Sequence, residues 1–116
     1  MASKDTTQLE VKVHQQLREC SEIFLALADP VRHDIIMMLT KHDTLNVAQI
    51  VERSPMSRSA ISHHLKILRQ AGLISSNKVA TEIFYSLDIE APVLQLKAFI
   101  ETTEQIMAWK SANEAE

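Results

Sequence analysis

One stretch of the chain decides its fold: Ser57-Arg-Ser-Ala-Ile-Ser-His-His-Leu-Lys-Ile-Leu-Arg-Gln-Ala-Gly-Leu73. In a helix over residues 57–71, apolar side chains fall on one side and short polar or basic side chains on the other. Ser57 is a favourable N-cap, and Gly72 is a favourable residue just past the end of a helix. The polar side carries no carboxylate that would repel phosphate. Such a helix suits the major groove of DNA.

The segments on either side of this helix complete a recognisable unit. Before it, Asn46 can cap a short helix, and Ser54-Pro55 forces a turn, so residues 46–71 predict a helix-turn-helix. After it, residues 73–79 and 82–87 are rich in β-forming residues and are joined tightly near residues 80–81. Residues 73–87 therefore predict a β-hairpin, the wing of a winged helix.

Helical patterns also occupy both ends of the chain. Apolar residues recur at helical spacing over residues 8–28, with a bend or break expected near Cys20–Ser21. Asp29 as N-cap and Pro30 at the first position begin a helix that runs to about residue 41. A last helix is expected over residues 91–109. The predicted fold is mainly α with a small β-hairpin: a winged helix-turn-helix with an extra helix at each end, in one domain over residues 1–116.

Composition narrows the class of protein. The chain has 116 residues, of which 46% are hydrophobic and 23% charged, as in a globular domain. Its single cysteine, Cys20, allows no intramolecular disulfide and fits a reducing compartment. No apolar run approaches the roughly 18 residues that span a bilayer, and no signal peptide is recognisable. No nucleophile–base grouping or glycine-rich phosphate loop is present. We therefore expect a cytoplasmic protein that is not an enzyme.

The charge distribution favours a polyanionic partner in spite of a net charge of −3. Residues 53–81 hold five basic residues and no acidic one, whereas the segments on both sides are acidic. Phosphate contacts dominate the affinity of proteins for DNA, so this segment is where DNA would dock. The alternative is a solvated face that happens to lack acidic residues, and charge alone does not separate the two.

Residues 24–88 resemble the ArsR/SmtB repressors of bacteria. The similarity lies in Leu27–Arg32, in the recognition-helix signature Ser62–Ile74 and in the strand Ile83–Leu87. The resemblance implies a homodimer, held by the first and last helices (8–28 and 91–109), on an inverted-repeat operator in double-stranded DNA. Both end helices carry more apolar surface than a small monomer needs. Two recognition helices would then lie about 34–36 Å apart, one turn of DNA.

The candidate DNA-binding residues follow from the polar side of the central helix. Ser59, Ser62 and His63 are expected at base edges, and Arg58 and Lys66 at phosphates or a guanine. The full set of candidates is Ser57, Arg58, Ser59, Ser62, His63, Lys66, Arg69 and Lys78. His64 falls towards the apolar side and is expected to be packed and hydrogen-bonded. The wing departs from the family pattern, because Lys78 is the only basic residue of residues 73–87 and the tip of the wing lacks glycine. Contacts of the wing with DNA should therefore be weak.

The sequence does not identify the ligand that would regulate DNA binding. Family members that sense soft metals carry Cys-x-Cys in a stretch that matches residues 44–50, where this chain has no thiol. Others bind zinc on the last helix, and the matching positions here are carboxylates: Asp88, Glu90, Glu101 and Glu104. An all-oxygen set would suit Mn, Ca or Mg better than Zn. The alternative, which the residue types favour, is that these carboxylates interact with the helix N-terminus and with solvent. We expect no cofactor, and the inducer is unidentified.

Three functions are consistent with these patterns. The first is a sequence-specific, homodimeric repressor. The second is a winged-helix module for protein contact, for which acidic ends and a poor wing would be no handicap. The third is a metal-responsive repressor with a carboxylate-rich site on its last helix. They differ in whether DNA binding weakens steeply with salt and in whether an ion binds.

Overall fold

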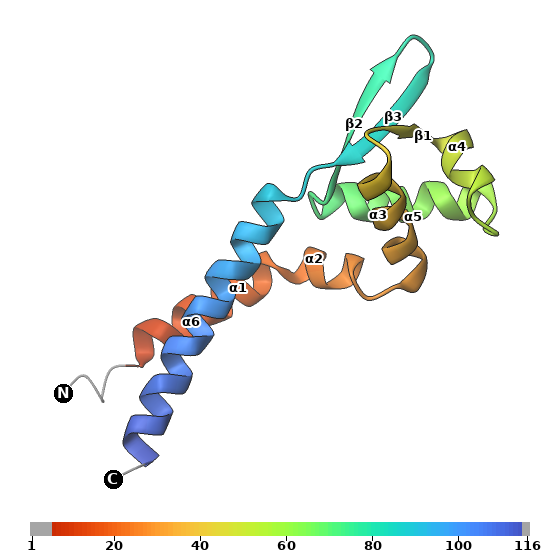
Figure 1. Ribbon diagram of the computed structural model, residues 1–116. Helices are drawn as coiled ribbons and strands as arrows, with labels where there is room; N and C mark the ends of the chain where they lie inside the picture. The colour runs from red at the N-terminus through yellow and green to blue at the C-terminus, as the bar shows by residue number, and fades with distance from the viewer. Residues whose placement is uncertain (1–5, 115–116) are drawn as a thin grey trace. The chain divides into compact units, whose positions relative to one another are not determined.

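A computed structural model describes residues 6–114 of the chain (Figure 1). The chain divides into two compact units. Residues 22–92 form the first, and the described parts of residues 1–21 and 93–116 belong to the second.

Three helices of the first unit begin directly after the residues that the sequence marks as N-caps. Helix α3 (Pro30–Lys41) begins after Asp29, whose carboxylate accepts the Val31 N–H at 2.8 Å. Helix α4 (Val47–Glu52) begins after Asn46 and helix α5 (Arg58–Gln70) after Ser57, each capped by that side chain. The short helix α2 (Ser21–Ala26) precedes them. The predicted helix-turn-helix is confirmed in its two helices and their starts.

Gly72 ends α5 in the way that its position predicts. Its φ of +76° is in the left-handed region, where a side chain is strained. The Gly72 N–H donates to the Arg69 carbonyl and the Leu73 N–H to the Leu68 carbonyl, both at 3.0 Å. This pair of bonds is the Schellman arrangement, which satisfies carbonyls that the end of a helix leaves free.

The first unit also contains a three-stranded antiparallel sheet. Strands β2 (Ile74–Val79) and β3 (Glu82–Leu87) form the predicted hairpin, whose tip holds Ala80 at a φ of +58°. The third strand, β1 (Leu45–Asn46), was not predicted; it pairs with β3, so the strand order is β1-β3-β2. Strand β1 comes just before α4, and its pairing therefore attaches the wing to the helix-turn-helix.

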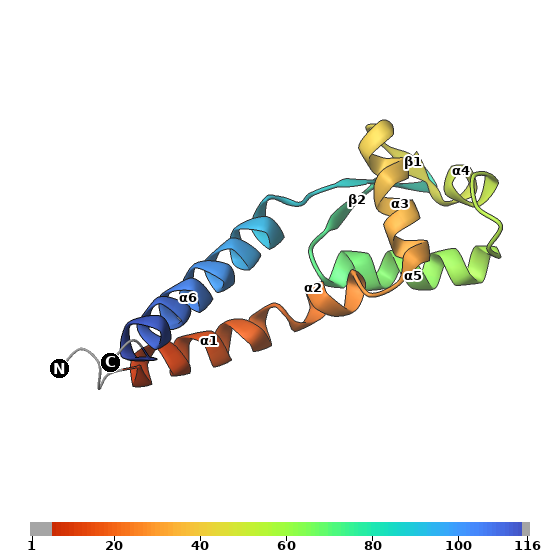
Figure 2. The ribbon, with the colours of Figure 1, turned by 60° about the horizontal axis from the view of Figure 1, so that its bottom comes forward.

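The core of this unit is aliphatic. Helix α3 crosses α5 and packs against it, and α4 and β2 also pack against α5 (Figures 1 and 2). The buried aliphatic side chains of these helices are Ile35 and Leu39 on α3, Ile50 on α4, and Ile61, Leu65 and Leu68 on α5. A buried leucine or isoleucine contributes about 1.5–3 kcal/mol to folding, so this cluster holds α5 by one face.

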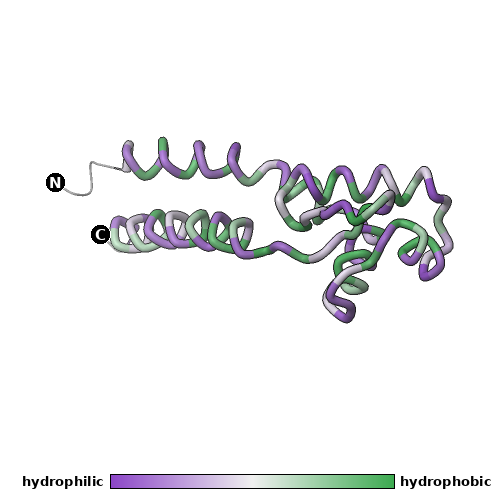
Figure 3. The backbone as a smooth tube through the Cα atoms, turned by 90° about the horizontal axis from the view of Figure 1, so that it is seen from above, coloured by the Kyte–Doolittle hydropathy of each residue, from purple (hydrophilic) through white to green (hydrophobic). Residues whose placement is uncertain are grey.

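The second unit contains α1 (Thr7–Glu19) and most of α6 (Glu90–Glu114). The expected break is present, because α1 ends at Glu19 and α2 begins at Ser21. Helix α6 continues five residues beyond the end expected at residue 109. Hydrophobic residues recur along its turns (Figure 3). Among the described residues, no helix is long and apolar enough to cross a membrane.

Candidate nucleic-acid interface

Helix α5 has a buried apolar face and an exposed polar face. Ile61, Leu65 and Leu68 are buried in the core, and His64 is buried beside them. The opposite face exposes Arg58, Ser59, Ser62, His63, Lys66, Arg69 and Gln70. None of these is acidic, so the exposed face is neutral or basic along its whole length.

The beginning of α5 is suited to an anion. The Ser57 hydroxyl oxygen accepts the Ala60 N–H at 3.2 Å and lies 3.3 Å from the Ser59 hydroxyl oxygen. A hydroxyl that accepts one hydrogen bond still has its own proton to donate. The N–H groups and the positive dipole end of a 13-residue helix add to the attraction for phosphate.

The two remaining candidate residues lie towards the wing. The Arg69 guanidinium donates to the Ser76 hydroxyl on β2 at 3.2 Å, which joins the end of α5 to the hairpin. Lys78 is exposed near the tip of β2. The structure therefore brings Ser57, Arg58, Ser59, Ser62, His63 and Lys66 onto one helix face, with Arg69 at its far end and Lys78 on a separate strand.

A second link between wing and helix-turn-helix was missed at the level of sequence. The Asn46 side-chain amide donates to a Glu82 carboxylate oxygen at 3.1 Å. An open cavity of about 250 Å³ lies beside this pair, between the start of α4, the start of α5 and the wing tip. Its lining includes Arg58. The two residues lie far apart in the chain, and no local pattern connects them.

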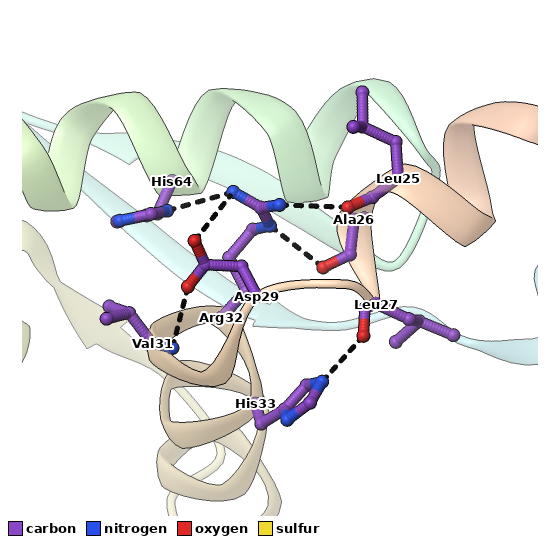
Figure 4. Close-up of polar contacts among 8 residues, drawn as sticks. All are labelled: Leu25, Ala26, Leu27, Asp29, Val31, Arg32, His33 and His64. Atoms are coloured by element: carbon purple, nitrogen blue, oxygen red, sulfur yellow. Dashed lines mark hydrogen bonds and ion pairs between the residues drawn. The ribbon is translucent and has the colours of Figure 1, made fainter.

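Arg32 joins three elements at the buried side of α5 (Figure 4). Its Nε donates to the Ala26 carbonyl and its Nη2 to the Leu25 carbonyl, both at 2.8 Å. Its Nη1 lies 3.1 Å from His64 Nδ1 and 3.8 Å from an Asp29 carboxylate oxygen. His64 is thus packed and hydrogen-bonded, as the sequence predicts. The sequence alone does not indicate its partner Arg32, which lies in the stretch Leu27–Arg32 that resembles a family signature.

Burial lowers the pKa of His64 from its ordinary value, and the charges of Arg32 and His63 lower it further. The Asp29 carboxylate acts in the opposite direction. The pKa of Asp29 is itself lowered, first by the hydrogen bond from the Val31 N–H and then by the nearby charges of Arg32 and His64. The shift of the His64 pKa favours its neutral form, and the shift of the Asp29 pKa favours a charged carboxylate beside Arg32.

The four candidate metal-binding carboxylates are not assembled into a site within one chain. Asp88 precedes α6, Glu90 begins it, and Glu101 and Glu104 are exposed on it. Within residues 6–114, no group of three His, Cys, Asp or Glu side chains is placed to hold a metal ion. Glu101 and Glu104 line an open cavity of about 470 Å³ whose other walls are mostly apolar side chains of α6.

The helix-turn-helix, the hairpin and the acid-free face of α5 define a winged-helix DNA-binding protein. Comparison with known proteins agrees. The profile of the family described as bacterial regulatory protein, arsR family, matches residues 29–76. The transcriptional repressor SdpR of Bacillus subtilis is 38% identical over 68 residues, which cover 59% of this chain and 74% of SdpR.

Two further relatives extend the match. An uncharacterised helix-turn-helix regulator of Methanocaldococcus jannaschii is 34% identical over 71 residues, covering 61% of this chain and 80% of that one. The solved structure of an ArsR-like transcriptional regulator from Rhodococcus superimposes with a TM-score of 0.66 at 31% identity, covering 85% of this chain and 86% of the other. The chain belongs to the ArsR/SmtB family. It is a DNA-binding transcription regulator and not an enzyme.

Proposed function

We propose that the chain acts as a homodimeric repressor on an inverted-repeat operator, with α5 of each copy in the major groove. The observation that carries the proposal is the exposed face of α5, which is polar or basic at every position while the opposite face is anchored in the core. In a dimer, the two helices would enter successive major grooves about 34–36 Å apart.

The side chains of α5 differ in whether they suit base edges or phosphates. The hydroxyls of Ser59 and Ser62 and the imidazole of His63 are short hydrogen-bonding groups that suit base edges. Arg58 and Lys66 suit phosphates or a guanine, and Ser57 at the helix start suits a phosphate. Arg69 and Lys78 complete the basic surface. Because Arg69 is held by its bond to Ser76 on the wing, it suits a phosphate of the DNA backbone.

A stripe on α6 supports the dimer. Val93, Ile100 and Met107 recur every seven residues and are 49%, 54% and 61% exposed. Residues seven apart lie on the same face of a helix, so the three form a continuous apolar stripe. Val11 and Leu17 on α1 are also exposed, at 63% and 43%. Covering such surface with a second copy removes it from water at a gain of about 25 cal/mol per Å².

Selection of bound sequences from random duplexes, followed by fluorescence anisotropy, tests the DNA reading. We expect Ser62→Ala and His63→Ala to lose preference for the selected duplex over a scrambled one while the melting temperature stays nearly constant. His42→Ala, which removes an exposed histidine at the end of α3, is the matched control. Unchanged preference in both α5 variants would show that this face does not read bases.

Salt dependence separates the repressor from a winged-helix module for protein contact. A protein that neutralises 6–10 phosphates loses about 10³–10⁵ in affinity between 50 and 200 mM salt. We expect a loss of this size, and a flat response would favour the protein-contact module.

A reporter gene placed behind the selected operator distinguishes repression, which we expect, from activation.

Sedimentation of Ile100→Glu tests the dimer, because the substitution places a charge in the middle of the apolar stripe. We expect it to sediment as a monomer and to bind the operator weakly, whereas Glu104→Gln should remain dimeric.

The proposal includes no resident metal. Calorimetry with Mn, Zn and Ca, repeated on Glu101→Gln, should give no heat of binding with either protein; heat that Glu101→Gln abolishes would establish the carboxylate site instead.

A further inference from the structure

A buried hydrogen bond joins the proposed recognition helix α5 to α3. Arg32 on α3 and His64 on α5 are 6% and 8% exposed, and Arg32 Nη1 lies 3.1 Å from His64 Nδ1. A guanidinium has donors and no acceptor, so His64 Nδ1 must accept this hydrogen bond. The histidine is therefore neutral and carries its proton on Nε2.

The guanidinium of Arg32 is fixed in place by its other partners. Two of its nitrogens donate to the carbonyls of Leu25 and Ala26 at 2.8 Å, at the end of α2 (Figure 4). Its third nitrogen group faces both His64 and the carboxylate of Asp29. Arg32 thus has no freedom to follow His64 if the histidine moves. The bond between them adds to the aliphatic core a directional link between α5 and the ends of α2 and α3.

His64 lies next to the residues that face outward. Ser62 and His63 directly precede it on α5, and both are exposed. A rotation or shift of the helix at His64 is carried to these two side chains, because neighbouring residues of a helix move as one rigid body. The length of a hydrogen bond varies by only a few tenths of an ångström. A displacement of about 1 Å is therefore enough to misalign hydrogen bonds with base edges.

We propose that Arg32 and His64 are positioning residues for DNA recognition: neutral His64, held by Arg32, places α5 for the groove, and protonation of His64 releases it. A protonated imidazole can no longer accept from Arg32, and it places a second positive charge 3.1 Å away from a guanidinium that cannot retreat. The effect on DNA affinity rests on the proposed insertion of α5 into the groove. The movement of α5 itself does not.

The surroundings of His64 determine the sign. Burial is the largest effect and disfavours protonation of His64, Asp29 at the start of α3 favours it, and Arg32 from α3 and His63 from α5 disfavour it. The other two elements packed against α5, namely α4 and β2, each carry one ionisable side chain, Glu52 and Lys78, and both are exposed. Release of α5 is therefore expected below the ordinary histidine pKa of about 6.5.

His63 would act in the opposite direction. It is exposed on the polar face, where a positive charge would strengthen binding to DNA. Comparing the unchanged protein with His64→Gln removes this contribution, because both proteins keep His63. A glutamine amide oxygen can accept from Arg32 but cannot be protonated in this range, so His64→Gln keeps the bond and removes its titration.

The first experiment is an NMR titration of the full chain without DNA, from pH 7.5 to 5.5. We expect His64 to titrate below the ordinary histidine pKa and the backbone amides of α5 to shift with the same midpoint. In His64→Gln those amide shifts should disappear, while in His63→Gln they should persist. Titration of His64 without any response of the α5 amides would overturn the positioning role, whatever the protein does with DNA.

The second experiment measures dissociation constants for the selected duplex over the same pH range at fixed salt. The ratio of the constant of the unchanged protein to that of His64→Gln should be near one at pH 7.5 and rise as the pH falls to 5.5. It should stay below the roughly tenfold per subunit that a histidine with the ordinary pKa of about 6.5 would give. A ratio that does not change with pH would overturn the link to recognition. If neither protein binds DNA at pH 7.5, the proposed function fails, and the titration of α5 still decides the positioning role.

Discussion

Asn46 and Glu82, 36 residues apart in the chain, are joined by a hydrogen bond of 3.1 Å from the amide nitrogen to the carboxylate oxygen. The same asparagine caps α4, because its side-chain oxygen accepts the Gln49 N–H and the Gln49 side chain accepts the Asn46 N–H. It also pairs with Phe84 across β1 and β3. One residue thus connects the first helix of the helix-turn-helix with the wing.

The two roles of Asn46 can be separated by substitution. Asn46→Ala removes both the cap and the contact with Glu82, and loss of an N-cap costs about 1 kcal/mol. Asn46→Ser keeps a capping oxygen and is too short to reach Glu82 in the same way. We expect urea denaturation to place Asn46→Ser between the unchanged protein and Asn46→Ala. Equal losses for the two variants would mean that the contact with Glu82 accounts for the whole effect and the cap for none.

Glu82 itself is expected to weaken DNA binding. Its carboxylate lines the same cavity as Arg58, at the end of α5 proposed to meet phosphate. Glu82→Gln keeps an oxygen that can accept from Asn46 and removes the negative charge. At low salt it should bind any duplex about two- to fivefold more tightly, and the gain should shrink as salt screens the charges. Glu22→Gln, an exposed change on α2, is the control, and an equal gain there would reduce the effect to net charge.

The parts of the fold that could be predicted are those with local signals. Asp29, Asn46 and Ser57 cap helices through bonds to N–H groups two or three residues away, so the sequence around each one is sufficient. The signals from Gly72 and from the two runs of β-forming residues are similarly local. The polar face of α5 followed from helical periodicity, which placed its candidate residues on one exposed side.

The parts that could not be predicted depend on distant partners. Strand β1 has two residues, too few to show a period, and it exists because β3 pairs with it. The same applies to the bonds from Asn46 to Glu82 and from Arg32 to His64, which join segments 36 and 32 residues apart. Periodicity placed His64 on the buried side, but only the crossing of α3 and α5 supplies its partner.

The tip of the wing is strained at Ala80. Its φ of +58° costs a residue with a side chain about 1–2 kcal/mol, and glycine adopts it freely. The greater freedom of glycine in the unfolded chain offsets about 0.4–1 kcal/mol of that gain. We expect Ala80→Gly to stabilise the protein by about 0.5–1 kcal/mol in urea denaturation. Ala48→Gly, an exposed change inside α4, should destabilise it by about the same amount, and a loss in both variants would contradict the strain.

The stability of the protein should fall in two separate ranges as the pH is lowered. The pKa of His64 is lower in the folded protein than its ordinary value of about 6.5, so the unfolded chain takes up the proton first. This contribution is fully present above pH 6.5 and is lost as the pH falls through the folded pKa. The pKa of Asp29 is also lowered, so its contribution is present above its ordinary value of about 3.9 and is lost below it.

Two variants assign these ranges to their residues. His64→Gln should lose less stability than the unchanged protein between pH 7.5 and 5.5, because its amide does not titrate. Asp29→Asn still provides an N-cap oxygen for α3 and should lose less stability than the unchanged protein between pH 5 and 3. Urea denaturation across the two ranges measures both differences. If His64→Gln lost as much stability above pH 5.5 as the unchanged protein, the neutral histidine beside Arg32 would have no part in holding α5 to α3.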